Sequence, residues 1–197
     1  MRTTKIVVAT RNPGKLSEFR ALLAPAGWQV IGLSEAAIDR DVAETGSSFA
    51  ENARLKAVGY SAETELPVLG DDSGLEVFAL GGMPGVRSAR YAGADASDSD
   101  RVRKLLQELG RQGGNRAARF HCALAMARRG EILCEAEGEC RGEIAMAPRG
   151  TLGFGYDPVF FVPGLGLTFA ELAEEEKNRL SHRARAVAAL LAQLSHC

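Results

Sequence analysis

The sequence lacks the features that mark several large classes of protein. No apolar run among its 197 residues approaches the roughly 18 residues that a membrane-spanning helix requires. No charged-then-apolar leader precedes Ile6. The formal net charge is only −1, which disfavours a polyanion such as nucleic acid as the main partner. We therefore expect a soluble, cytoplasmic protein that binds neither membrane nor nucleic acid.

Cysteine is scarce and lacks the spacing of common zinc sites. The four cysteines are Cys122, Cys134, Cys140 and Cys197, and no CxxC pair occurs among them. Three of them fall in strand-like segments, where buried thiols are common. We interpret the cysteines as reduced packing residues, with a metal cluster as the alternative.

The order of elements predicts a mixed α/β fold in a single domain over residues 1–197. With 46% hydrophobic residues, the chain is long enough for one substantial core, and it shows no repeat, low-complexity tract or evident linker. Strand-like runs are KIVVAT, WQVIGL, LPVLG, LEVFAL, ARFHCALAMA and EILCEAEGE. Helical segments follow Pro13, Ser47, Ser97, Thr168 and Ser181. The helix after Ser97 has one apolar stripe, is expected to end at Gly110, and looks purely structural.

The first candidate site is the segment KIVVATRNPGK, from Lys5 to Lys15. Asn12 is a good N-cap and Pro13 fits the first helical position, so a helix begins directly after the strand. Its free N–H groups lie beside Lys15, and a helix N-terminus next to an ammonium attracts phosphate. It is not a Walker A loop, because only one glycine precedes Lys15. An ordinary capped helix with an exposed lysine remains the alternative.

The second candidate is the segment ETGSSFAENARLKA, from Glu44 to Ala57. At 100° per residue, Lys56 falls within about 60° of the apolar stripe of this helix, so it lies on the buried face. A buried lysine requires an anion, unless it snorkels past Tyr60. Glu44 lies in the preceding loop, where its carboxylate either reaches a metal or is merely solvated.

The third candidate, PVLGDDSGLEV, places Asp71 and Asp72 directly after an apolar strand. Gly70 and Gly74 flank the pair and predict a tight turn. Burying adjacent carboxylates is costly without a cation, and such an oxygen-rich site suits Mg²⁺. An Asp-rich turn with Ser73 bonding to the backbone is the alternative. The row Glu135, Glu137 and Glu139 is typical of a solvated strand face.

The C-terminal third adds an aromatic loop, GTLGFGYDPVFFVPG. Its glycines either expose the rings of Phe154 and Tyr156 to a flat ligand or form a turn that packs on the core. In the following helix, Arg183 projects onto the buried stripe, whereas Arg185 points away. A cation in a first helical turn is not favoured by the helix dipole, so a ligand explains Arg183 better than helix stability does.

Six blocks in this order resemble the inosine/xanthosine triphosphate pyrophosphatase family. They are TRNPGK, ETGSSFAENARLKA, DDSGLEV, GGMPGVRSARYAG, GFGYDPVFF and EEKNRLSHRARA, and they span nearly the whole chain. The resemblance implies Mg²⁺-dependent hydrolysis of non-standard purine nucleoside triphosphates (ITP, dITP, XTP) to the monophosphate and pyrophosphate. It also implies an elongated α/β structure with a mixed central sheet flanked by helices, a substrate cleft between two lobes, and a homodimer.

The resemblance and the residue chemistry together suggest a role for each site residue. Thr10, Arg11, Asn12, Pro13, Gly14 and Lys15, with Lys56, would hold the triphosphate, and Glu44 and Asp72 would hold Mg²⁺. Asp72 would orient or deprotonate the attacking water, with Asp71 as its supporting neighbour, and Ser73 would contact the substrate. Phe154, Gly155, Tyr156, Asp157, Lys177, His182 and Arg183 would surround the base.

One departure from the family pattern is Arg11, where many members carry glycine. Two other functions stay open from residue chemistry alone. A nucleotide-sensing module could bind phosphates without turnover, although the paired aspartates argue against it. A hydrolase of pyrimidine triphosphates is disfavoured only by the family resemblance.

Overall fold

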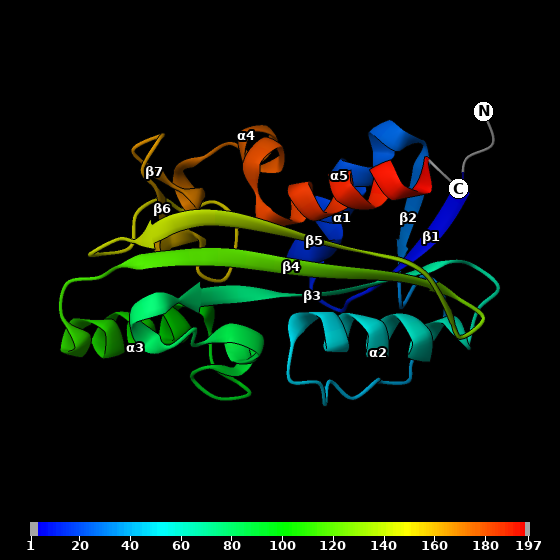
Figure 1. Ribbon diagram of the computed structural model, residues 1–197, viewed down its shortest axis with the longest axis horizontal. Coiled ribbons are helices and arrows are strands. Elements are labelled where there is room, and N and C mark those ends of the chain that lie inside the picture. Colours follow the sequence, from blue (N-terminus) through cyan, green and yellow to red (C-terminus); the bar gives the residue numbers. More distant parts are fainter. Residues whose placement is uncertain (1–3, 196–197) are drawn as a thin grey trace. The chain divides into compact units, whose positions relative to one another are not determined.

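The computed structural model describes residues 4–195, and its strands form one mixed seven-stranded sheet (Figure 1). The strands are β1 (Thr4–Ala9), β2 (Trp28–Gly32), β3 (Val68–Val77), β4 (Ala117–Arg128), β5 (Glu131–Ile144), β6 (Phe160–Val162) and β7 (Leu167–Thr168). Their order in the sheet is β2-β1-β3-β4-β5-β6-β7. β1 pairs in parallel with β2 and β3, whereas β6 pairs antiparallel with β5 and β7. The α/β prediction is therefore confirmed.

Five α-helices accompany the sheet in the described part of the chain. They are α1 (Pro13–Leu23), α2 (Phe49–Ser61), α3 (Asp98–Gln112), α4 (Glu174–Leu180) and α5 (His182–Leu194). None of the helices in residues 4–195 is long and apolar enough to cross a membrane. The caps Asn12 and Ser97 are confirmed, whereas α2 is capped by Ser48 and α3 runs past Gly110 to a cap at Gly113.

The predicted turn at Asp71 and Asp72 is wrong, because both residues lie inside the ten-residue strand β3. The two predicted strands LPVLG and LEVFAL are largely one, and the chain leaves it after Val77 in a short 3₁₀ turn. Gly70 serves close packing instead of a turn. A Cβ atom there would lie 2.2 Å from the carbonyl oxygen of Ala53 in α2. The glycine therefore lets this helix approach the strand that carries both aspartates.

The contacts divide the chain into two compact units, each built from several segments. Unit 1 consists of residues 1–72, 122–138 and 182–197, and unit 2 consists of residues 73–121 and 139–181. The predicted single domain and the predicted cleft between two lobes both stay predictions.

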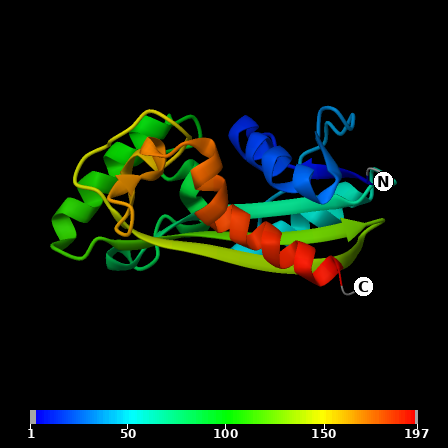
Figure 2. The same ribbon diagram turned by 90° about the horizontal axis from the view of Figure 1, so that it is seen from above.

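Unit 1 buries both faces of its parallel strands. Ile6 and Val8 of β1 pack with Phe19 of α1 and Leu190 of α5, whereas the alternate residue Val7 packs on the opposite face. Figures 1 and 2 show α1 and α5 on one face of these strands, with α2 on the other. This double burial explains why β1 reads as a continuous apolar run.

Unit 2 has its own aromatic core. The rings of Phe120 and Phe160 have centroids 4.5 Å apart, and Phe169 lies 4.8 Å from Phe160. Val102 and Leu105 on the predicted stripe of α3 pack into the same cluster. The helix expected after Thr168 begins later, at Glu174, because a 3₁₀ turn intervenes.

The cysteines behave as packing residues where the structure describes them. Cys122 and Cys140 are buried, Cys134 is half-buried, and none of these three described cysteines forms a disulfide. Cys197 lies outside the described residues.

Candidate active site

The residues predicted for the site belong to both units. Unit 1 contains the segment Thr10–Lys15, Glu44, Lys56, Asp72, His182 and Arg183, and unit 2 contains Ser73, Phe154, Gly155, Tyr156, Asp157 and Lys177. The chain passes from one unit to the other between Asp72 and Ser73, and again directly before His182.

The loop between β1 and α1 presents Lys15 in the first turn of the helix. The side chain of Asn12 accepts the Lys15 backbone N–H at 3.0 Å, and the Asn12 N–H donates to the Thr10 hydroxyl at 3.1 Å. The exposed Arg11 donates instead to Asp41, at 2.9 Å, on the loop before α2. The capped turn with its lysine is thus present, while the contact of Arg11 with phosphate stays a prediction.

Lys56 is buried on α2, as its place on the apolar stripe predicted. Its side chain is 8% exposed, and its Nζ lies 2.9 Å from Glu44 Oε1 and 3.5 Å from Asp72 Oδ1. Burial alone would lower the pKa of Lys56, but the neighbouring carboxylates outweigh burial and raise it. Lys56 is therefore a fixed cation held between two acids from different parts of the chain.

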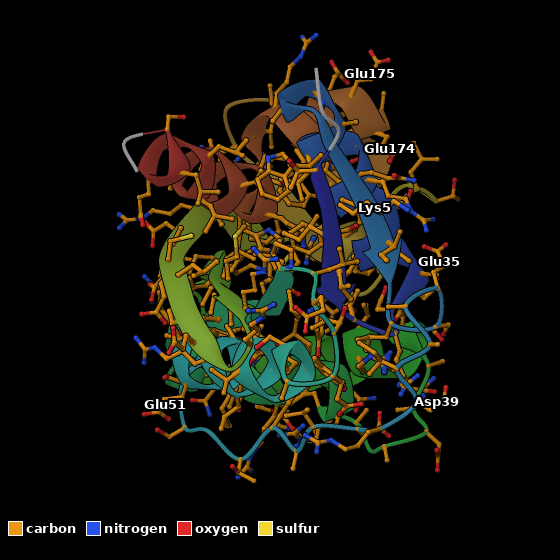
Figure 3. All side chains as sticks on the ribbon, turned by 90° about the vertical axis from the view of Figure 1, so that its right-hand side faces the viewer. Lys5, Glu35, Asp39, Glu51, Glu174 and Glu175 are labelled. Atoms are coloured by element: carbon orange, nitrogen blue, oxygen red, sulfur yellow. The ribbon has the colours of Figure 1, made fainter. Side chains whose placement is uncertain are left out.

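The start of α2 binds the loop that carries Glu44. Glu51 accepts both the backbone N–H and the hydroxyl of Ser47, at 2.6 and 2.8 Å. The Gly46 N–H donates to Asn52 Oδ1 at 2.8 Å. Figure 3 shows this loop running from the labelled Asp39 along the outside of α2 to the start of the helix near Glu51.

Asp72 is buried in β3, and two residues of α2 contact its carboxylate. Asn52 Nδ2 donates to Asp72 Oδ2 at 3.0 Å, while Lys56 faces Asp72 Oδ1. Burial raises the pKa of Asp72, and neither the lysines nor the hydrogen bond from Asn52 cancels that effect. A buried carboxylate with a raised pKa is better suited to accept a proton than an ordinary one.

The carboxylate of Asp71 contacts other residues than that of Asp72 does. Lys15 Nζ lies 2.6 Å from its Oδ2, and the Cys122 thiol donates to its Oδ1 at 3.2 Å. Burial alone would raise the pKa of Asp71, but Lys15, Arg183 and Lys56 together lower it. Asp71 is therefore a firmly ionised anchor for Lys15.

Arg183 projects inward from the first turn of α5, as predicted, and it is 2% exposed. Its guanidinium forms an ion pair with the buried Glu18 of α1, and its Nε lies 3.9 Å from Asp71 Oδ1. These two carboxylates account for a buried arginine at this position, where the sequence suggested a ligand. His182 is also buried. The assignment of both residues to the base stays a prediction.

The aromatic loop in unit 2 is held by Asp157, which lies within the loop, and by Lys177 of α4. Asp157 Oδ2 accepts the Phe154 N–H at 3.0 Å and also binds Lys177 Nζ. The Lys177 ammonium lies 4.9 Å from the centroid of the Phe154 ring. Lys177 therefore has a fixed place beside a half-exposed ring.

Tyr156 belongs to the core of unit 2 instead of being exposed. The residue is 4% exposed, and its hydroxyl donates to the Ser88 carbonyl at 2.9 Å. The neighbouring Gly155 N–H donates to Asp98 at the start of α3, at 2.6 Å. Of the two alternatives for this loop, the packed turn holds for Tyr156.

Several further residues contact the predicted site residues, and their sequence positions do not reveal this. Glu18, Asn52 and Cys122 supply partners in unit 1, and Ser88 and Asp98 do so in unit 2. Glu18 is buried in α1, but its position next to Phe19 does not indicate this, because adjacent helical residues lie about 100° apart. The others have no pattern in the sequence that separates them from ordinary polar residues.

The carboxylates of unit 1 fit a Mg²⁺ ion. Glu44 and Asp72 converge on one ammonium, so their oxygens lie within reach of a common cation. Mg²⁺ takes one or two carboxylates and leaves its other positions to water and phosphate. No group of three or more His, Cys, Asp or Glu in residues 4–195 could hold a metal ion. The ion pairs of this cluster join three cations (Lys15, Lys56, Arg183) to four carboxylates (Glu18, Glu44, Asp71, Asp72).

Comparison with known proteins shows the family. Residues 6–193 match the model of the Ham1 family. The chain belongs to this family. A dITP/XTP pyrophosphatase of Geobacillus kaustophilus is 56% identical over 187 residues, covering 94% of this chain and 92% of the relative. One of Gloeobacter violaceus is 54% identical over 190 residues, covering 96% and 94%.

Solved structures of Ham1 proteins show the same fold. The HAM1 protein of Coxiella burnetii superposes with a TM-score of 0.88 at 42% identity and covers 98% of this chain and 100% of its own. The Ham1 protein of Staphylococcus aureus gives a TM-score of 0.86 at 44% identity, covering 98% and 99%. These findings confirm the resemblance found in the six sequence blocks.

Proposed function

We propose that this protein hydrolyses non-standard purine nucleoside triphosphates (ITP, dITP and XTP) to the monophosphate and pyrophosphate, with Mg²⁺ as cofactor, and so cleanses the nucleotide pool. One observation carries the proposal: Lys56 lies between Glu44 and Asp72 in unit 1, in a chain of the Ham1 family. Relatives that share about half of its residues are named dITP/XTP pyrophosphatases, which supports two of these substrates.

The phosphates are assigned to unit 1. The loop Thr10–Lys15 offers N–H donors of a capped helix, and Lys15 and Lys56 offer ammonium groups. Glu44 and Asp72 would hold the Mg²⁺, which neutralises charge on the phosphate oxygens when bound. Asp72 orients or deprotonates the attacking water, and Asp71 holds Lys15 in place. Phosphoryl transfer depends chiefly on such positioning and charge neutralisation.

The base is assigned to the aromatic loop and α4 of unit 2, with His182 and Arg183 at the start of α5. Phe154 offers a face for stacking, and the Lys177 ammonium beside it is an N–H donor group that also binds Asp157. A donor at this position suits a purine with a carbonyl at C6. Ser73 follows Asp72 directly and is assigned to the substrate on that ground.

The test is a pyrophosphate-release assay with Mg²⁺ over ITP, XTP, GTP, ATP, dUTP and TTP. We expect release from ITP and XTP far above the other four. Saturable binding of ITP without pyrophosphate release would indicate a nucleotide sensor. Preferred release from dUTP or TTP would indicate a pyrimidine-specific hydrolase.

The assembly and location of the protein are part of the same proposal. The resemblance to the family suggests a homodimer, and the use of the nucleoside triphosphate pool suggests the cytoplasm. Light scattering of the purified full chain should give twice the mass of one chain, which is 21.0 kDa. A monomeric mass at micromolar concentration would contradict the dimer without affecting the hydrolysis.

A further inference from the structure

Asn52 is a buried polar residue that no role in the proposed reaction yet explains. It lies in the first turn of α2, and its side chain is fully shielded from solvent. A buried amide is costly unless its donor and its acceptor are both paired. Here the acceptor takes the Gly46 N–H at 2.8 Å, and the donor binds Asp72 Oδ2 at 3.0 Å.

The partners define the orientation of the amide. A backbone N–H can only donate, so the atom that faces Gly46 must be the oxygen. The nitrogen then faces the carboxylate. An aspartate could not donate at neutral pH and an alkyl side chain could do neither, so the residue type matches both partners.

The contact with the loop is close as well as polar. A Cβ atom at Gly46 would lie 2.8 Å from Asn52 Oδ1 and 2.7 Å from the Cβ of Glu51. Only glycine lets the loop backbone approach α2 in this way. The backbone of the loop that carries Glu44 therefore packs directly against Asn52 at Gly46.

The two carboxylates assigned to the metal are thus connected through α2 by two residues one helical turn apart. Asn52 binds one oxygen of Asp72, and Lys56 faces the other. Asn52 holds the Glu44 loop through Gly46, and Lys56 binds Glu44 itself at 2.9 Å. Lys56 carries a positive charge, whereas Asn52 is neutral and only orients its two hydrogen-bond partners.

We propose that Asn52 is a positioning residue, which fixes Asp72 and the Glu44 loop relative to each other and thereby sets the affinity of the site for a divalent cation. The inference rests on the proposed function, because that function assigns Glu44 and Asp72 to the metal. Partners that orient metal ligands typically change metal affinity or activity about 10–100-fold when they are replaced.

The experiment measures Mn²⁺ binding to the full chain by electron paramagnetic resonance, without nucleotide. Asn52→Leu keeps a similar shape and removes both hydrogen bonds, and we expect it to raise the Kd for Mn²⁺ at least about tenfold. Asn52→Ala is a second, smaller variant for the case that leucine prevents folding. In both variants the Mg²⁺ concentration at half-maximal pyrophosphate release should rise by a similar factor.

Ser61→Ala is the matched control. Ser61 lies on the same helix, is 1% exposed, and also makes two hydrogen bonds, to the Val58 carbonyl and from the Gly130 N–H. It is nine residues from Asn52, about 13 Å along the helix axis. We expect it to lower thermal stability as Asn52→Ala does while leaving the Kd for Mn²⁺ unchanged.

Two outcomes would overturn the inference. An Asn52→Leu or Asn52→Ala protein that folds and binds Mn²⁺ like the wild type would reduce Asn52 to a structural residue. Absence of Mn²⁺ binding in the wild-type protein would refute the proposed cation site itself. Weakened Mn²⁺ binding in the Asn52 variants, together with a wild-type protein that releases no pyrophosphate at saturating Mg²⁺, would instead refute the proposed function and leave the role of Asn52 intact.

Discussion

Asp71 and Asp72 are neighbours in one strand, yet their surroundings shift their pKa values in opposite directions. Both are buried, which disfavours the charged form. For Asp71 the cations Lys15 and Arg183 outweigh burial, and its pKa is lowered. For Asp72 burial dominates, and its pKa is raised. Alternation along the strand sends the two side chains to opposite faces, which gives Asp71 the contacts of an ionised anchor and fits the role of base that we propose for Asp72.

We predict that Asp72→Asn leaves the protein folded but removes most of its activity. The substitution is nearly isosteric and deletes both a metal-binding charge and the proposed base, so turnover of ITP should fall by at least about 10²-fold. Pyrophosphate release measures the loss, and circular dichroism checks the fold. Near-normal turnover in the folded variant would assign the base to another residue.

The opposite pKa shifts also predict opposite effects on stability in the absence of metal. A lowered folded pKa means that ionised Asp71 stabilises the fold above its unfolded pKa, and this contribution is lost as the pH falls. A raised folded pKa means that protonated Asp72 stabilises the fold below its unfolded pKa. This stabilisation is lost as the pH rises through the folded pKa. At pH 7, ionised Asp72 therefore opposes folding.

Urea unfolding at pH 7 with a chelator should separate the two residues. Asp71→Asn breaks a buried ion pair and should lower the free energy of unfolding by about 3 kcal/mol. Asp72→Asn should leave it unchanged or raise it, and any gain should shrink as the pH is lowered toward 4. Equal losses in both variants would show that the two environments do not differ in this way.

At the scale of elements, close helix–strand contacts are made through glycines. Gly70 of β3 admits the backbone of α2, and Gly138 of β5 admits the start of α5, where an added Cβ would lie 2.3 Å from the Ala186 nitrogen. Both helices carry residues assigned to the site. The glycines thus determine how near Lys56 and Arg183 can come to the aspartates of β3.

We predict that Gly70→Ala costs both stability and activity. Its Cβ would meet backbone atoms of α2, which cannot move without shifting the helix, so the free energy of unfolding should fall by about 3 kcal/mol. Gly110→Ala in α3 is the control, since nothing lies within 4 Å of its added Cβ and alanine favours a helix by roughly 0.5–1 kcal/mol. Chemical denaturation and pyrophosphate release measure both variants. Equal stability of the two would contradict the packing role of Gly70.

The elements were predictable wherever a local pattern defines them. Helix starts at Asn12 and Ser97 follow from cap residues, and Lys56 and Arg183 stood out because each interrupts an apolar stripe. The strand through Asp71 was missed because glycine beside aspartate is typical of a turn, and the close contact with α2 comes from residues 53 and 57. Asn52 was missed for a similar reason, since its partners are separated from it in the chain.

At the scale of the whole molecule, most residues proposed for the base belong to a different unit from those proposed for the phosphates, although His182 and Arg183 lie in unit 1. Lys15, Lys56 and Asp72 lie in unit 1, whereas Phe154 and Lys177 lie in unit 2. Sequence order alone could not reveal this division, because β3, β4 and β5 each contribute residues to both units. Substitutions in the two units should therefore change different properties of the enzyme.

The wild-type protein should rank ITP and XTP far above ATP and GTP in kcat/KM. Lys177 offers donors, adenine presents an amino group at C6, and a donor facing a donor leaves buried groups unpaired. Sites built for hydrogen bonding discriminate by factors of about 10⁴ on this ground. Guanine shares the C6 carbonyl, so its exclusion requires a further donor that faces C2. Comparable hydrolysis of GTP and ITP would refute the proposal that a donor faces C2.

Lys177→Met and Lys15→Met should then separate recognition of the base from handling of the phosphates. Lys177→Met removes the donor beside Phe154, so kcat/KM for ITP should fall about 10–100-fold more than that for ATP, within the range for a lost hydrogen bond to a buried polar group. Lys15→Met removes a cation that every triphosphate meets, so all substrates should lose by a similar factor. The measurement is kcat/KM for ITP, XTP and ATP in each variant. Equal loss of all three substrates in Lys177→Met would move Lys177 from the base to the phosphates, because only a contact common to every triphosphate lowers them alike.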